Sequence, residues 1–183
     1  MPITIGAKPE ATFADPIGML KDCHRRIERF LNVLAQLSPA AGRPLDPAQR
    51  ASFETALQYF REAAPKHTAD EEDSLFPRLR AKQSTGVQSA FATLDSLHHD
   101  HARADALHAE VDRLGRAWLA QGTLPPADSA RFSELIAELV ELYRAHIAVE
   151  ETDLFPVAAA ALETPERQAM GAEMAARRGL QSR

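Results

Sequence analysis

Apolar residues recur every three or four positions along four long stretches of the chain, the spacing that gathers side chains on one face of an α-helix. The first two stretches follow Asp-Pro pairs at Asp15 and Asp46, and an acidic residue before proline is typical of a helix start. The third runs from about Val87 to Leu119, and the fourth begins after Pro126. The pattern predicts an all-α fold, an up-down-up-down antiparallel four-helix bundle.

The two ends of the chain lie outside this pattern. Residues 1–14 contain two prolines and a glycine without a helical period, so an N-terminal arm is predicted there. The bundle is expected to cover residues 15–160, which form two similar halves of two helices each. In residues 161–183 a short C-terminal fifth helix is predicted, with its cap at Thr164 and its end before Gly179. Its simplest role is to cap the bundle.

A histidine interrupts each of the four apolar stripes. In the second and fourth stripes a glutamate follows that histidine four positions later, within a string that occurs twice: His, three residues, Glu-Glu, two residues, Leu-Phe-Pro. Residues four apart on a helix lie side by side, so each string presents an imidazole and a carboxylate to one centre. The candidate metal ligands are His24, His67, Glu71, His101, His146 and Glu150.

Burying these six side chains without partners would cost several kcal/mol per ion, which is large beside the roughly 5–15 kcal/mol of net stability of a domain. Divalent metal offsets that cost, because neutral imidazoles and carboxylates are its ligands. Four histidines and two carboxylates exceed the needs of one tetrahedral zinc and suit a pair of ions, for which two non-haem irons are the natural choice and manganese or zinc are substitutes. If each glutamate and one oxo or hydroxo group bridge the ions, each ion keeps an open position for a small molecule.

Several neighbouring polar residues have more than one interpretation. Glu72 and Glu151 are expected to face a neighbouring helix or water, as surface charges or as acceptors for the ligand histidines. His98 is expected to be solvated or to lie behind the ligands, with a metal ligand as the alternative, and His108 is expected to be a core or rim histidine. Cys23 is expected to be a packed thiol, with a redox sensor as the alternative.

Two further expectations concern the helices that carry the repeated strings. Asp70 is not expected to be a ligand, because its counterpart in the second half is Val149. Pro77 and Pro156 lack a backbone N–H donor and are expected to end or bend their helices just past the site.

The duplicated strings resemble those of the hemerythrin-like, or HHE cation-binding, family. The likeness covers roughly residues 15 to 160 and rests on DCH at His24, HxxxE at His67, HDH at His101 and HxxxE at His146. It implies an antiparallel four-helix bundle around a non-haem di-iron centre, with the six candidate residues as ligands. It also implies a role in O2 carriage or sensing, in the NO or oxidative-stress response, or in iron handling.

The chain departs from that family in two places. Oxygen-carrying hemerythrins supply two histidines four apart from the third helix, whereas Leu97 and Asp105 stand four residues from His101 here. The missing fifth histidine argues against reversible O2 carriage. Relatives that repair iron-sulfur clusters carry an N-terminal segment with a cysteine, which the arm of this chain lacks, so repair is not expected.

Composition narrows the class of partner. With a net charge of -5 over 183 residues and interspersed acids and bases, neither nucleic acid nor an anionic membrane is an expected partner. A single cysteine and the absence of a leader predict a cytoplasmic protein. The expected function is binding or sensing of O2, NO or peroxide at an open iron position, with a protein partner for a sensor. The alternatives are a di-iron enzyme that reduces peroxide or NO, and an iron-handling protein.

Overall fold

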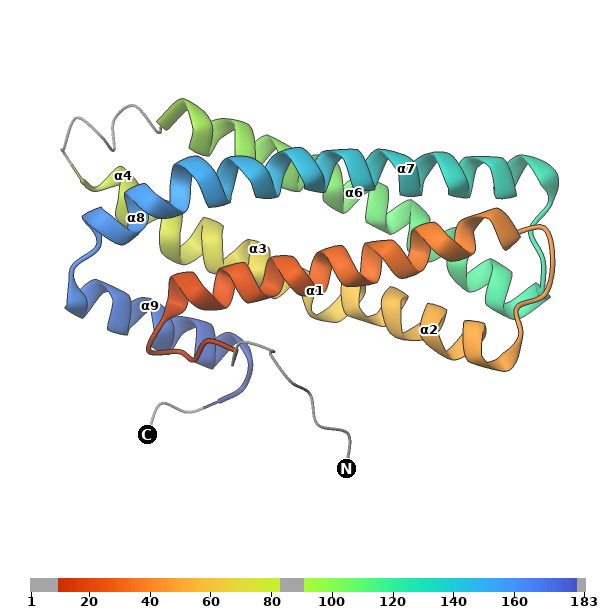
Figure 1. Ribbon diagram of the computed structural model, residues 1–183, viewed down its shortest axis with the longest axis horizontal. Coiled ribbons are helices and arrows are strands. Elements are labelled where there is room, and N and C mark those ends of the chain that lie inside the picture. Colours follow the sequence, from red (N-terminus) through yellow and green to blue (C-terminus); the bar gives the residue numbers. More distant parts are fainter. Residues whose placement is uncertain (1–9, 83–90, 181–183) are drawn as a thin grey trace.

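The computed structural model describes residues 10–82 and 91–180, which form an antiparallel bundle of four helical arms (Figure 1). The described residues contain helices and no strand, so the predicted all-α bundle is confirmed. The elements of the first two arms are α1 (Pro16–Leu37), η1 (Ser38–Ala40), α2 (Pro47–Glu62), α3 (Ala64–Ala69), η2 (Asp70–Leu75) and α4 (Phe76–Arg80). The remaining elements are α6 (Phe91–Gln121), α7 (Pro126–Val149), η3 (Glu150–Leu154), α8 (Phe155–Ala161) and α9 (Thr164–Arg177).

Both predicted Asp-Pro helix starts are confirmed. The Asp15 carboxylate accepts a hydrogen bond from the backbone N–H of Gly18, at 3.0 Å, and so caps α1. Asp46 accepts from the backbone N–H of Ala48 and of Gln49, whose side chain accepts in return from the Asp46 backbone. These bonds satisfy N–H groups that have no partner within the first turn of a helix. The expected start of the third helix at Val87 lies outside the described residues.

The second and fourth arms are not continuous α-helices, because each contains a π-helical turn, η2 and η3. Pro77 and Pro156 were expected to end or bend their helices. They do not end them, since α4 and α8 continue through them, and the bend stays a prediction. Each proline lies in the first turn of the α-helix after the π-turn, where a backbone N–H is not needed. Single π-turns occur often at functional sites, and both of these begin next to the candidate ligands.

Two hydrophobic clusters fill the bundle, one on each side of the candidate ligands. The larger cluster includes Phe53, whose ring lies 4.9 Å from that of Trp118, together with apolar residues of α1, α2, α6 and α7. The other cluster includes Leu20, Leu75 and Leu154 and residues of α9. Along α1, Leu20 belongs to the second cluster and Ile27 to the first, so His24 lies between them. The polar centre is therefore enclosed by apolar packing at both ends.

The predicted fifth helix is α9, which packs against α1 and η2 (Figure 1). Its cap is Glu163, in a capping box with Glu166, whereas Thr164 is the first helical residue. Met170 and Met174 are fully buried in the smaller hydrophobic cluster. α9 thus closes the bundle over one of the two π-turns.

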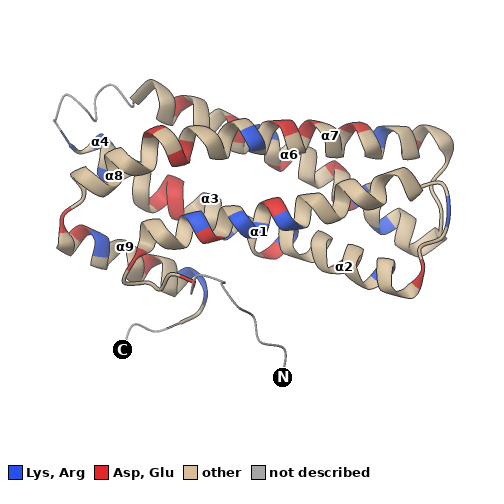
Figure 2. Ribbon diagram, viewed as in Figure 1, with Lys and Arg blue, Asp and Glu red and all other residues tan. Residues whose placement is uncertain are grey.

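Charged residues of both signs are interspersed along the helices (Figure 2). Within the described ranges, no helix combines the length and the apolar character that crossing a membrane requires. Nearly all large apolar side chains of these ranges are buried or partly buried, and Leu180 is the exposed one.

Candidate metal centre

The structure brings all six candidate ligands together in the middle of the bundle. Every one of them is buried, with no more than 6% of its surface exposed. They come from all four arms, because α1, α3, α6 and α7 each supply one histidine, while η2 and η3 supply the glutamates. Their nitrogen and oxygen atoms form two overlapping groups that share both glutamates.

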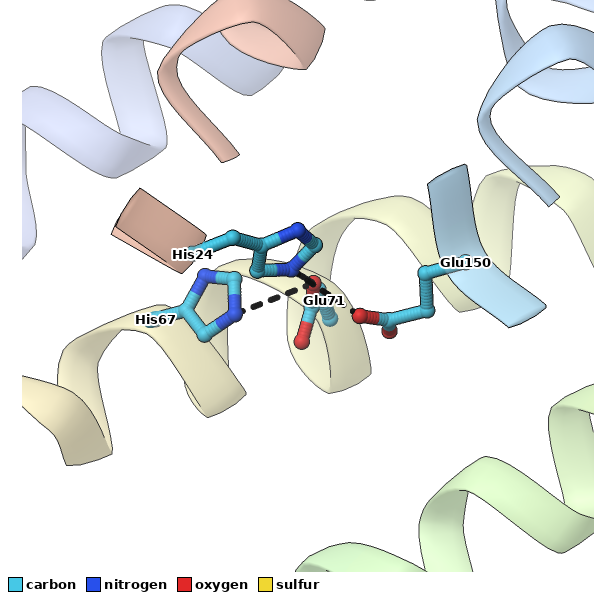
Figure 3. Close-up of side chains that lie close together, drawn as sticks. All are labelled: His24, His67, Glu71 and Glu150. Atoms are coloured by element: carbon cyan, nitrogen blue, oxygen red, sulfur yellow. Dashed lines mark ion pairs between the residues drawn. The ribbon is translucent and has the colours of Figure 1, made fainter. Parts of the chain in front are cut away.

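Site A consists of His24 and His67 with the two glutamates (Figure 3). The Nε2 atom of His24 lies 3.0 Å from Oε2 of Glu150 and 3.9 Å from Oε1 of Glu71. The Nε2 atom of His67 lies 3.4 Å from the same Oε1 of Glu71. Four ligand atoms, all within 4.8 Å of one another, therefore face a common point.

Site B consists of His101 and His146 with the same two glutamates. The Nε2 atom of His101 lies 3.3 Å from Oε2 of Glu71. The Nε2 atom of His146 lies 3.3 Å from Oε1 of Glu150. Each glutamate thus turns one oxygen towards site A and the other towards site B, which is the arrangement that a carboxylate bridge between two ions requires.

The ligand atoms lack hydrogen bonds of normal geometry. Both carboxylate oxygens of Glu71 and of Glu150 are buried without a hydrogen-bond partner among the described residues, and so are Nε2 of His24 and of His101. Each such atom costs about 1–3 kcal/mol when it is left unpaired. Two nitrogens and two oxygens at each site are a donor set that divalent transition metals accept, and metal at both sites would occupy all of these atoms.

Burial and mutual proximity also shift the protonation of these groups. Burial, reinforced by the neighbouring Glu150, raises the pKa of Glu71 well above its usual value. Burial opposes the ionisation of Glu150, but His146 and His24 outweigh it and lower the pKa of that carboxyl. Burial lowers the pKa of His67. Without metal, Glu71 therefore holds its proton to a higher pH and His67 stays neutral to a lower pH than exposed groups would, and metal binding would release a proton from Glu71.

Carboxylates lie behind two of the ligand histidines. Glu151 Oε1 is 2.9 Å from Nδ1 of His24, and Glu72 Oε1 is 2.8 Å from Nδ1 of His101. The second glutamate of each repeated string therefore faces a histidine of the other half of the chain, one of the two interpretations that the sequence left open. Such a carboxylate fixes the orientation of the imidazole and makes it a better metal ligand.

The other two ligand histidines differ from each other. Asp100 Oδ2 lies 3.4 Å from Nδ1 of His146, a contact that sequence reasoning missed although Asp100 directly precedes His101 in the HDH string. Nδ1 of His67 has no hydrogen-bond partner within the described part of the chain. The environments of the two sites are therefore not equivalent.

Asp70 is buried but belongs to neither site. Its carboxylate pairs with Arg177 at 2.9 Å and with Arg178 at 2.7 Å, so two arginines at the end of α9 hold the start of η2. Arg177 also donates to Oγ of Ser74, at 2.8 Å. The two arginines and Asp70 lie more than 100 residues apart in the chain.

Three residues that the sequence left open lie beside the centre. The His98 side chain is 67% exposed and its Nδ1 lies 2.8 Å from Oε1 of Glu72, so it contacts the centre only through that carboxylate. Cys23 is buried and its sulfur accepts from Nη2 of Arg26, at 3.2 Å. The ring of His108 stacks on Phe60 at 4.3 Å. None of the three belongs to the two ligand groups.

His108 also links the centre to a cavity of about 330 Å³ between α2 and α6. Its Nε2 lies 3.1 Å from the hydroxyl of Tyr143, and the ring of Tyr143 lies 6.5 Å from that of His146. Burial lowers the pKa of His108 to about 4, so the imidazole is neutral at pH 7. Asp105 and Pro65, each within four residues of a ligand histidine, line the same cavity.

Comparison with known proteins gives two findings. The family model described as the hemerythrin HHE cation binding domain matches residues 15–158, which include all six candidate ligands. An uncharacterized protein of Haemophilus influenzae (strain ATCC 51907 / DSM 11121 / KW20 / Rd) is 31% identical over 172 residues, a match that covers 92% of each chain.

Proposed function

The chain belongs to the hemerythrin HHE cation-binding domain family, and from this membership and the geometry of its centre we propose that it holds two non-haem irons that bind or sense a small ligand. The proposal rests mainly on the orientation of the two carboxylates. Glu71 and Glu150 each place one oxygen near the histidines of site A and the other oxygen near the histidines of site B. His24 and His67 would hold one ion, and His101 and His146 the other, with both glutamates as bridges.

Bound iron would supply an acceptor for O2, NO or peroxide at a position that the protein leaves free. Each site offers four protein atoms, so an ion that prefers six ligands would keep room for a small molecule there. The donor set also suits manganese or zinc. For a sensing role, a partner protein would carry the response.

The surrounding side chains would keep water away from the ions. The ring of Phe155 stacks on that of His24 at 5.4 Å, and the ring of Phe76 on that of His101 at 6.2 Å. Leu75 and Leu154 are fully buried in the adjacent hydrophobic cluster. These apolar walls would favour small uncharged ligands over larger or ionic ones.

A second candidate function is enzymatic, the reduction of peroxide or NO. It is favoured by the cavity beside His108, which is large enough for a small organic reductant, and by the chain of rings from His108 through Tyr143 to His146. A metal centre that only binds its ligand has no need of such a second compartment.

Anaerobic titration of the reduced, iron-loaded protein with NO separates the two functions. Binding or sensing predicts an optical change that saturates at a fixed ratio of NO to protein and reverses when the gas is removed. Continuous consumption of NO or peroxide with an added reductant would instead favour the enzyme. More than two irons per chain would favour a role in iron handling.

A further inference from the structure

The two metal positions have unequal surroundings, and the following inference rests on the proposed two-metal function. We propose that site B is the tighter position and fills first, because carboxylates back both of its histidines, whereas only one histidine of site A is backed by a carboxylate. Glu72 and Asp100 are thereby assigned as positioning residues of site B. No contact of either residue with a metal ion is implied.

The hydrogen bonds behind the histidines give the first argument. At site B, Glu72 lies behind His101 at 2.8 Å and Asp100 behind His146 at 3.4 Å. At site A only His24 has a carboxylate behind it. A carboxylate that accepts from the Nδ1–H of a ligand histidine raises the basicity of the imidazole, and its loss typically weakens metal binding 10- to 100-fold.

The internal repeat shows where the missing carboxylate would stand. Asp100 directly precedes His101, and Cys23 directly precedes His24, the equivalent histidine of the first half. The thiol of Cys23 accepts from Arg26 and offers no negative oxygen. Nδ1 of His67 is buried without a partner among the described residues, whereas its equivalent in His146 faces Asp100. At this position the second half of the bundle has an acidic residue and the first half has a cysteine.

The ion pairs of the carboxylates behind the histidines give a second argument. Arg25 pairs at 2.7 Å with Glu151, the carboxylate behind His24 of site A. Figure 2 shows basic residues along α1, the helix that carries Arg25. In the described chain neither Glu72 nor Asp100 pairs with lysine or arginine, so the carboxylates of site B keep more of their negative charge for the imidazoles in front of them.

Zinc titration of the metal-free protein, followed by NMR of the histidine rings, tests this order with a diamagnetic probe. In the wild type, the ring nitrogens of His101 and His146 should shift during the first equivalent of Zn²⁺ and those of His24 and His67 during the second. The readout reports occupancy of each site and requires no activity. It also distinguishes unequal sites from simple repulsion between two ions at equal sites, which would shift all four rings together.

Three variants make the test specific. Glu72→Gln and Asp100→Asn should each weaken site B about 10- to 100-fold, so that the filling order becomes equal or reversed. Their side chains are 25% and 28% exposed, so the fold should tolerate both changes. Asp105→Asn is the matched control: it removes the same charge from α6, at a residue outside both ligand groups. In this variant the wild-type order should persist.

The outcomes separate this inference from the proposed function. Two bound zinc ions with all four rings shifting together, or with His24 and His67 first, would overturn the unequal sites and leave the metal centre standing. The unequal sites would also be overturned if neither Glu72→Gln nor Asp100→Asn changed the order in which the two sites fill. Failure of zinc to shift any of the four rings would overturn the proposed function and this inference with it.

Discussion

Replacement of Glu71 by glutamine should stabilise the metal-free protein, and increasingly so as the pH rises. Glu71 is fully buried, and burial together with Glu150 raises its pKa well above the ordinary 4.5. The folded, metal-free protein therefore holds the proton on this carboxyl to a higher pH than the unfolded chain does. A group whose pKa is raised on folding contributes its full stability below the unfolded pKa and loses it as the pH rises.

The size of the effect follows from the same linkage. Each pH unit above the unfolded pKa costs the wild type about 1.4 kcal/mol for as long as Glu71 stays protonated. Above the unfolded pKa of Glu71 the gap between the glutamine variant and the wild type should therefore widen by about 1.4 kcal/mol per pH unit until the folded pKa is reached. The lowered pKa of His67 affects stability only below pH 6.5, and the raised pKa of His146 acts in both proteins. The comparison therefore isolates Glu71.

Urea denaturation of both proteins in the presence of a chelator, followed by helical circular dichroism at three pH values, measures this gap. Glu151→Gln is the matched control, because Arg25 lowers the pKa of Glu151 and its replacement should cost stability by an amount that does not change above pH 6.5. Parallel pH curves for the wild type and Glu71→Gln would refute the reasoning. A loss of stability in Glu71→Gln that grows with pH would refute it as well.

Three other substitutions test the packing around the centre. Asp70→Ala leaves two arginines without their buried partner and should cost about 3–5 kcal/mol in urea denaturation, against less than about 1 kcal/mol for the more exposed Glu173→Ala. The lowered pKa of His108 stabilises the fold fully above pH 6.5, and this stability is lost as the pH falls to 4. The wild type should therefore lose about 3 kcal/mol of unfolding free energy over this range, and His108→Phe should not. Gly171→Ala would place a methyl group against the backbone carbonyl of the N-terminal segment and should lower the melting temperature, whereas Gly42→Ala, with open space around it, should not.

The bundle and the convergence of the six polar residues could be predicted from sequence because both follow from periodicity. An apolar stripe with period 3.6 sets the inner face of each arm, and a histidine on that stripe must lie inside. The π-turns did not disturb this prediction, since η2 and η3 begin at Asp70 and Glu150, after most of the His–Glu spacing has been set by α-helix. The π-turns themselves could not be predicted, because six and five residues are too few to show a period.

Long-range partners could not be predicted in the same way. The pairing of Asp70 with Arg177 joins residues far apart in the chain, and no local pattern distinguishes it from a solvated charge. The contact of Asp100 was missed because its partner, His146, lies on another helix. For Glu72 and Glu151 the sequence left two interpretations, a surface charge or an acceptor for a ligand histidine. Their position on the helix indicates the direction of the side chain but not the residue that it contacts.

Metal content per chain tests the central claim most directly. Protein purified from iron-supplemented cells should contain about two irons per chain by plasma mass spectrometry. The double variant His67→Ala/Glu150→Ala should lose them, whereas His98→Ala, which changes an exposed histidine outside both sites, should keep them. Absence of stoichiometric metal in the wild type, or metal that the double variant retains, would contradict the di-iron centre.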